Sequence, residues 1–160
     1  MSDARAPSSK IEIRLLRPHL TATVRETVRQ DDLAAALGRI FQAVGQVVSQ
    51  QRIEKDGSLF ARYHSFGETI DLEAGVPVKS AIQPEGDVRP NELPSGPAAI
   101  AVHAGPYETL SQTYEAIQGW LEATGRTASG APWEIYLTDP SMEPDPAKWL
   151  TEVIFPLARG

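Results

Sequence analysis

Apolar and polar residues alternate along several stretches of the chain, which is the pattern of β-strands with one buried face. The strands predicted in this way are residues 11–16, 20–28, 59–64, 69–78, 98–103, 133–137 and 149–157. A short polar loop containing proline joins the last two, which predicts a hairpin. Within it, Trp133, Ile135 and Leu137 fall on one face, and Glu134 and Tyr136 on the other. A glutamate in mid-strand that shares its face with an aromatic residue indicates either a solvated face or a site that needs negative charge.

Two further stretches have helical spacing, with apolar residues three and four positions apart. The first contains Leu33, Leu37, Ile40, Phe41, Val44, Val47 and Val48, and the second contains Tyr107, Leu110, Tyr114, Ile117 and Leu121. Asp31 and Asp32 predict the start of the first helix. Gly125 predicts the end of the second.

The two halves of the chain have the same order of predicted elements: strand, helix, strand, strand. When they are aligned, Tyr63 matches Tyr136, Glu73 matches Glu152 and Pro77 matches Pro156. This indicates an internal duplication.

We therefore divide the chain into a disordered tail (1–10), pseudo-repeats over residues 11–78 and 97–157, and a linker over 79–96 that contains three prolines. The predicted class is α+β, with both helices on one face of a shared antiparallel sheet and a ligand cleft on the other face. By alternation, Tyr63, Glu134 and Tyr136 are expected to point into that cleft.

Composition narrows the possible functions. The chain has no cysteine, which excludes disulfides, thiolate metal sites and a cysteine nucleophile. Its net charge of −6, with scattered basic residues, argues against broad binding to a phosphate backbone. No apolar run is long enough for a membrane span, and no signal peptide is recognisable, so we expect a cytoplasmic protein.

A set of short motifs recurs in order along the chain and together resembles the GyrI-like small-molecule-binding domain, also found as the effector-binding domain of bacterial multidrug-sensing transcription activators. The motifs are Phe60-Ala61-Arg62-Tyr63-His64, Asp71-Leu72-Glu73-Ala74-Gly75-Val76-Pro77-Val78, Glu92-Leu93-Pro94-Ser95-Gly96, His103-Ala104-Gly105-Pro106-Tyr107, Trp133-Glu134-Ile135-Tyr136-Leu137 and Thr151-Glu152-Val153. The resemblance begins at about residue 11 and implies paired strand–helix–strand–strand modules with a ligand cleft between them.

The resemblance implies that Glu134 is the functional glutamate and that aromatic residues around it stack on flat, often cationic ligands. Tyr63, Tyr107, Tyr136 and Trp149 are the expected counterparts of those aromatics. Burial of an unpaired carboxylate is unfavourable, and a lipophilic cation would remove that penalty. Each aromatic face adds about 0.5–2 kcal/mol of cation–π attraction.

This interpretation predicts a stand-alone binding protein for small hydrophobic, aromatic and cationic molecules, used for sensing or sequestration, without a cofactor. Only about ten residues precede the first strand, so we expect no helix-turn-helix and no direct binding of nucleic acid. A regulator or DNA gyrase could be the protein partner.

Other functions remain open. Some members of the family hydrolyse flat, electrophilic natural products. In that case Glu134 would be a general base, and Tyr63 or Tyr136 an acid. Inhibition of DNA gyrase is a third possibility.

Each candidate residue also has a structural interpretation. Glu134 could be a solvated strand residue, and Tyr63 and Tyr136 could be cross-strand packing residues. Trp149 could close the edge of the core, and Tyr107 could brace the start of the helix. The three histidines are far apart in sequence and lack cysteine partners, so we predict no metal site.

Overall fold

The computed structural model describes residues 10–159, so the disordered tail expected over residues 1–10 lies outside them except for Lys10. These residues fall into two compact units. We call residues 17–95 the N-unit, and residues 10–16 together with 96–159 the C-unit.

The N-unit is a sheet covered on one face by a helix. It contains β2 (His19–Arg29), the 3₁₀ turn η2 (Gln30–Asp32), α1 (Leu33–Gln50), β3 (Phe60–Phe66), β4 (Thr69–Pro77) and β5 (Arg89–Leu93). The strands run antiparallel in the order β3-β4-β2-β5. α1 packs against β2 and β4, and its buried side chains include Ile40, Val44 and Val48.

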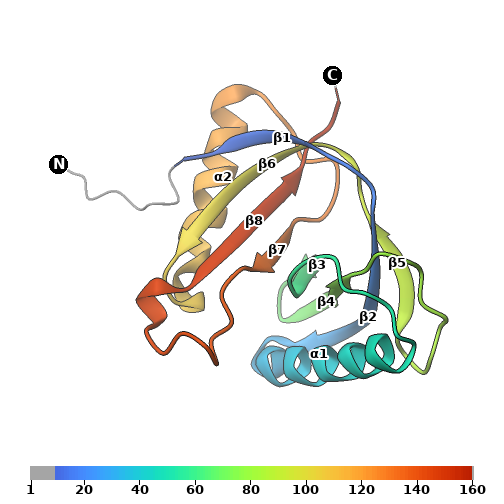
Figure 1. Ribbon diagram of the computed structural model, residues 1–160. Helices are drawn as coiled ribbons and strands as arrows, with labels where there is room; N and C mark the ends of the chain where they lie inside the picture. The colour runs from blue at the N-terminus through green and yellow to red at the C-terminus, as the bar shows by residue number, and fades with distance from the viewer. Residues whose placement is uncertain (1–9, 160) are drawn as a thin grey trace. The chain divides into compact units, whose positions relative to one another are not determined.

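The C-unit repeats this arrangement (Figure 1). It contains β1 (Glu12–Leu16), β6 (Gly96–Ala104), η3 (Tyr107–Thr109), α2 (Leu110–Thr124), β7 (Trp133–Tyr136), η4 (Pro146–Lys148) and β8 (Leu150–Pro156). The strands run antiparallel in the order β1-β6-β8-β7. α2 covers β6 and β8, and its Leu110 and Ile117 pack in one core with Ala101, Val153 and Phe155.

The predicted α+β class and the repeated strand–helix–strand–strand order are confirmed. Strand register agrees with the duplication, because Phe60 pairs with Gly75 where Trp133 pairs with Ile154. In the sequence alignment those two pairs occupy the same positions. Each residue of one unit can therefore be compared with its equivalent in the other.

Two features differ from the expectation. Residues 79–96 were expected to be a linker, yet they contain β5, in which Pro90 is tolerated because β5 is paired on one side by β2. Residues 11–16 were placed in the first repeat, yet β1 pairs with β6 of the second. The converse holds for β5, which comes just before β6 of the C-unit in the chain but pairs with β2 of the N-unit.

Candidate functional site

Glu134 is a buried carboxylate on the helix-facing side of the C-unit sheet. It is 4% exposed and lies opposite Val153 of β8. Directly paired residues of antiparallel strands point to the same face, and Val153 packs in the core with α2. This corrects our expectation that Glu134 would point away from the helices.

Two tyrosine hydroxyls bind the two oxygens of this carboxylate. Tyr114 of α2 donates to Oε1 at 2.7 Å, and Tyr136 of β7 donates to Oε2 at 2.6 Å. Hydrogen bonds of this length to an ionised acceptor are among the stronger ones in proteins. The prediction that Glu134 and Tyr136 share a strand face is confirmed by this contact. Glu134 is not a solvated strand residue.

An aromatic cluster continues from Tyr136. The ring of Tyr107 lies 5.6 Å from that of Tyr136 in an edge contact and 5.0 Å from that of Trp149 at an interplanar angle of 33°. The indole Nε1 of Trp149 donates to the carbonyl oxygen of Glu143 at 2.8 Å, which fixes the orientation of the ring. Tyr107 is 38% exposed, so the cluster reaches solvent at this residue.

The turn before α2 explains how Tyr107 is positioned. Gly105 has a φ of 136°, which an L side chain rarely adopts, and its N–H donates to the carbonyl oxygen of Trp149 at 2.8 Å. Buried His103 braces the turn, because its Nδ1 contacts the Thr113 hydroxyl and its Nε2 the Thr109 hydroxyl, both at 2.8 Å. His103 is thus a structural histidine.

The electrostatics of the cluster favour positive charge. Burial raises the pKa of Tyr107, and the negative charges of Glu134 and Asp139 raise it further. The phenol of Tyr107 therefore stays neutral at physiological pH, and the site does not acquire a phenolate.

Four of the five residues singled out from the sequence, Glu134, Tyr136, Tyr107 and Trp149, belong to one site in the C-unit. Tyr63 lies in β3 of the N-unit, where its ring makes an edge contact with Phe66 at 5.6 Å. Its role in ligand binding stays a prediction.

Tyr114 was missed, because its helical spacing with Leu110 and Ile117 was interpreted as core packing. Its ring does pack on Phe155, at 5.8 Å between centroids. A usable signal was present, since a tyrosine on the buried face of a helix needs a hydrogen-bond partner for its hydroxyl. Glu134 is such a partner.

Neither a metal set nor a membrane helix is found in the part of the chain that the structure describes. No three His, Cys, Asp or Glu side chains there lie close enough together to hold a metal ion. No helix within residues 10–159 has the length and apolar character needed to cross a membrane.

Comparison with known families shows which family the chain belongs to. The model of the GyrI-like small molecule binding domain matches residues 9–158. The chain belongs to this family. As a GyrI-like domain it is a small-molecule-binding module, and the candidate site in its C-unit contains the glutamate and aromatics that the sequence motifs indicated. No match was found among curated proteins.

Solved structures share the fold of this GyrI-like domain. The C-terminal domain of EcmrR superposes with a TM-score of 0.84 at 22% identity over 94% of this chain and 98% of that one. EcmrR in its complex with DNA gives a TM-score of 0.83 at 23% identity over 94% of this chain. In that complex the match spans only 58% of the EcmrR chain.

Two further solved structures share the fold at lower TM-scores, one of a hydrolase and one with a bound ligand. A hydrolase from Listeria innocua gives a TM-score of 0.67 at 14% identity, over 97% of this chain and 95% of that one. SAV2435, solved with tetraphenylphosphonium bound, gives 0.66 at 15% identity, over 93% and 94%. At such identities these likenesses establish the fold alone.

Proposed function

We propose that this GyrI-like domain binds small hydrophobic aromatic cations through Glu134 and the aromatic cluster beside it. The observation that supports this most directly is a carboxylate, 4% exposed, held by two phenolic hydroxyls next to Tyr107 and Trp149. SAV2435, which shares the fold, was solved with a cation of this class.

The arrangement favours a cation for two physical reasons. The hydroxyls of Tyr114 and Tyr136 orient the carboxylate without adding charge, so its attraction for a cation is strong in a water-poor setting. The faces of Tyr107 and Trp149 attract cations and bury apolar ligand surface. Neither contact demands a fixed pattern of ligand hydrogen bonds, so we expect several flat or propeller-shaped cations to bind.

Titration of tryptophan fluorescence tests the proposal, because Trp149 lies in the cluster. Tetraphenylphosphonium should bind the wild-type protein at least tenfold more tightly than neutral triphenylphosphine oxide. Glu134→Gln, which keeps the side-chain volume, should lose at least tenfold in affinity for the cation, worth about 1.4 kcal/mol or more. Its affinity for the neutral compound should change less than threefold.

Glu152→Gln is the matched control. Glu152 lies in the same unit on the opposite sheet face, paired with Ile135 in register and 3.5 Å from Arg14. This variant removes the same charge from the protein and should bind the cation as wild type does. Equal affinity of the cation for Glu134→Gln and Glu152→Gln would refute the proposal. Tyr63→Phe and Tyr63→Ala, measured in the same way, test whether Tyr63 contributes.

A hydrolytic function is the second candidate, since a carboxylate and two phenols within hydrogen-bond distance are an acid–base set. Glu134 would take a proton from water as it attacks an electrophilic carbon, and Tyr114 or Tyr136 would protonate the leaving group. Mass spectrometry of the recovered ligand distinguishes the two functions. A binder returns its ligand unchanged, whereas a hydrolase returns product with the mass of one water added.

We further propose that the domain serves in sensing or sequestration through a separate partner protein. In EcmrR the matching domain is part of a longer, DNA-binding chain. Co-purification with and without tetraphenylphosphonium would test for such a partner. A complex whose amount does not change with the ligand would argue against sensing.

A further inference from the structure

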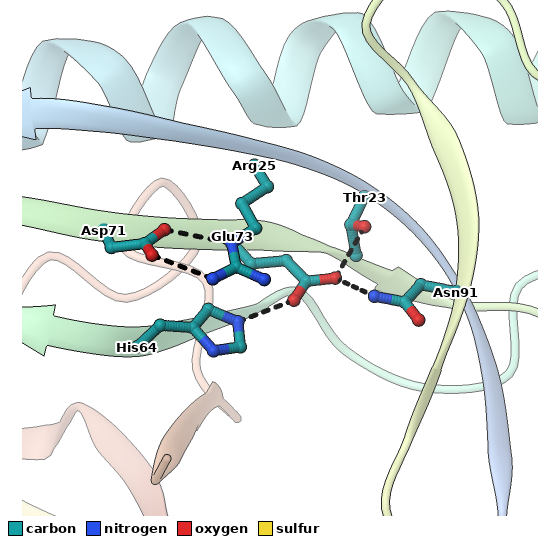
Figure 2. Close-up of polar contacts among 6 residues, drawn as sticks. All are labelled: Thr23, Arg25, His64, Asp71, Glu73 and Asn91. Atoms are coloured by element: carbon teal, nitrogen blue, oxygen red, sulfur yellow. Dashed lines mark hydrogen bonds and ion pairs between the residues drawn. The ribbon is translucent and has the colours of Figure 1, made fainter.

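A second buried glutamate, Glu73, organises a polar network in the N-unit, far from Glu134 in sequence and different in its partners. Glu73 is 4% exposed and accepts hydrogen bonds from the Thr23 hydroxyl at 2.9 Å, the Asn91 amide, and Nε2 of His64 at 2.9 Å. Figure 2 shows these contacts, with Arg25 and Asp71 beside them. The network links four strands, one residue from each of β2, β3, β4 and β5.

This network lies on the sheet face that α1 does not cover. Arg39 of α1 binds Glu26 of β2, so Glu26 marks the helix-facing side. Arg25 is the next residue and pairs in register with Glu73, which places both on the opposite side. Arg62 of β3 pairs with Glu73 from the other flank. Two arginines therefore bracket the glutamate across three strands.

The carboxylate of Glu73 is ionised and accepts its hydrogen bonds from side chains of the N-unit. Burial raises the pKa of Glu73, but the hydrogen bonds from His64, Asn91 and Thr23 outweigh it, and the net pKa lies below its usual range. The negative charge is therefore permanent at neutral pH, and it lies beneath more exposed side chains. The side chain of His64 is 19% exposed and that of Arg25 is 54% exposed, against 5% for Glu73.

The contact with Glu73 uses only one of the two ring nitrogens of His64. A register shift between Tyr63 and Ser65 brings His64 onto the face of Glu73, where Nε2 is used by the carboxylate. Among the described residues nothing forms a hydrogen bond with Nδ1. A protonated imidazole would thus direct one N–H at Glu73 and have a second N–H, on Nδ1, for another acceptor.

The outer layer of this face is cationic. Arg25 uses Nε and Nη2 to bind Asp71, at 3.0 and 2.8 Å. Arg29 pairs in register with Thr69 and Arg89 with Thr23, which adds two exposed guanidinium groups to the same face. Four arginines therefore stand against the three carboxylates of Asp56, Asp71 and Glu73, a local charge of +1 before any histidine is counted. The whole chain has a net charge of −6.

Comparison with equivalent residues of the C-unit shows which of these polar side chains the fold itself requires. Register equates Glu73 with Glu152, which is bound by Arg14 of the edge strand as Glu73 is bound by Asn91 of its own edge strand. The C-unit residues equivalent to Thr23, Arg25, Arg62 and His64 are apolar: Ile100, Val102, Ile135 and Leu137. The fold is thus built without these polar groups, so their presence in the N-unit has another cause.

We propose that His64, Arg62 and Arg25 form a second binding site, for a small oxyanion such as a carboxylate, sulfate or phosphate group. Nδ1–H of His64 donates to the anion, and the two guanidinium groups supply positive charge. Glu73 positions His64 from below. The site is independent of the Glu134 site, lies wholly within the N-unit, and takes ligands of opposite charge.

Sulfate is the first probe, because its charge is constant between about pH 5 and 8, where histidine titrates. Titration of ¹⁵N-histidine-labelled full-length protein at constant ionic strength, balanced with sodium chloride, should shift the His64 ring resonances saturably. His19, which lies on the same face and contacts Asp56 at 2.9 Å, should not shift with sulfate.

Variants separate this site from general attraction by positive charge. His64→Gln should lose at least tenfold in affinity for sulfate, and Arg25→Gln at least fivefold. Arg39→Gln is the matched control. Arg39, like Arg25, forms a bidentate ion pair, but its partner is Glu26 and it lies on the other face of the sheet. It should bind sulfate within twofold of wild type.

Several results would overturn the proposal: shifts that do not saturate, shifts that chloride reproduces, or equal losses in Arg25→Gln and Arg39→Gln. Binding of an acidic peptide without any binding of sulfate would also overturn it and would indicate a protein-docking face. The wild-type resonances decide the matter even if a variant fails to fold. Tetraphenylphosphonium binding should be unchanged in His64→Gln.

Discussion

Glu73 and Glu134 are equally buried at 4% exposure, yet their partners give them different roles. Glu134 accepts hydrogen bonds from two neutral phenols, and its proposed role is to bind a cationic ligand. Glu73 is bound by an imidazole, an amide and a hydroxyl, which together make it part of the unit's own structure. The donors that surround a buried carboxylate thus indicate whether it stabilises the fold or recognises a ligand.

Glu73→Gln should destabilise the protein in a pH-dependent way. The pKa of Glu73 is lowered in the folded state, so its contribution is present above the pKa of the unfolded chain, about 4.3, and is lost as pH falls through the folded pKa. At about pH 7 we expect the variant to lose about 1–3 kcal/mol, because the amide cannot accept all three hydrogen bonds.

Urea unfolding of both proteins from about pH 7 down to about pH 3 measures this effect. The stability difference should shrink below about pH 4. Glu152→Gln should change stability by no more than about 0.5 kcal/mol, since within residues 10–159 the carboxylate of Glu152 is paired only with exposed Arg14, at 3.5 Å. A difference between wild type and Glu73→Gln that stays constant across the range would contradict the assignment.

At the scale of elements, local pattern was sufficient wherever the neighbours in space were also neighbours in sequence. The α1 and α2 periodicities, the end of α2 at Gly125 with its φ of 69°, and the β7–β8 hairpin all follow from local spacing. β5 did not follow, because its five residues are defined by pairing with β2 rather than by alternation. The partner of β1 could not be predicted for the same reason.

The same limit applies to the site. Alternation placed Glu134 and Tyr136 on one face correctly, but it cannot say which face a helix will cover. The contribution of Tyr114 depends on the packing of α2 across β8, which is tertiary information. Sequence therefore predicted that the glutamate lies beside aromatic residues, which the contacts confirm, but it gave the wrong side of the sheet.

Close packing of β2 on β4 makes Gly75 a test of the N-unit sheet. A Cβ built on Gly75 would lie 1.9 Å from the carbonyl oxygen of Ala22, so the strands would have to separate. Gly75→Ala should cost about 2 kcal/mol or more in unfolding free energy. Gly38→Ala, in α1 with no atom within 4 Å of the added Cβ, should instead stabilise by about 0.5–1 kcal/mol. Thermal and urea unfolding of the two variants in parallel would show the opposite signs, and a stable Gly75→Ala protein would refute the packing argument.

At the scale of the whole molecule, the duplication separates what the fold requires from what was added to it. Register places Ala61 of β3 where β7 has Glu134, and the fifth residue of α1, Leu37, where α2 has Tyr114. The N-unit therefore folds with an apolar pair at the place where the C-unit has its carboxylate and phenol. Conversely, the N-unit has its polar network where the C-unit is apolar. The Glu134 group of the C-unit and the Glu73 network of the N-unit thus lie on opposite faces of equivalent sheets.

If the Glu134 group serves binding rather than folding, it can be replaced by apolar residues without loss of stability. The triple variant Glu134→Met, Tyr114→Phe, Tyr136→Phe keeps side-chain volume and removes the carboxylate together with the two hydroxyls that donate to it. Replacement of buried charged groups by well-packed apolar ones is often neutral or stabilising by about 1–4 kcal/mol. We therefore expect the triple variant to be at least as stable as wild type in urea and to lose binding of tetraphenylphosphonium.

Glu134→Met alone should be less stable than the triple variant, because it leaves two buried hydroxyls without their acceptor. A triple variant more than about 1 kcal/mol less stable than wild type would mean that Glu134 is part of the structural core, and the binding site would then have to be sought elsewhere in the domain.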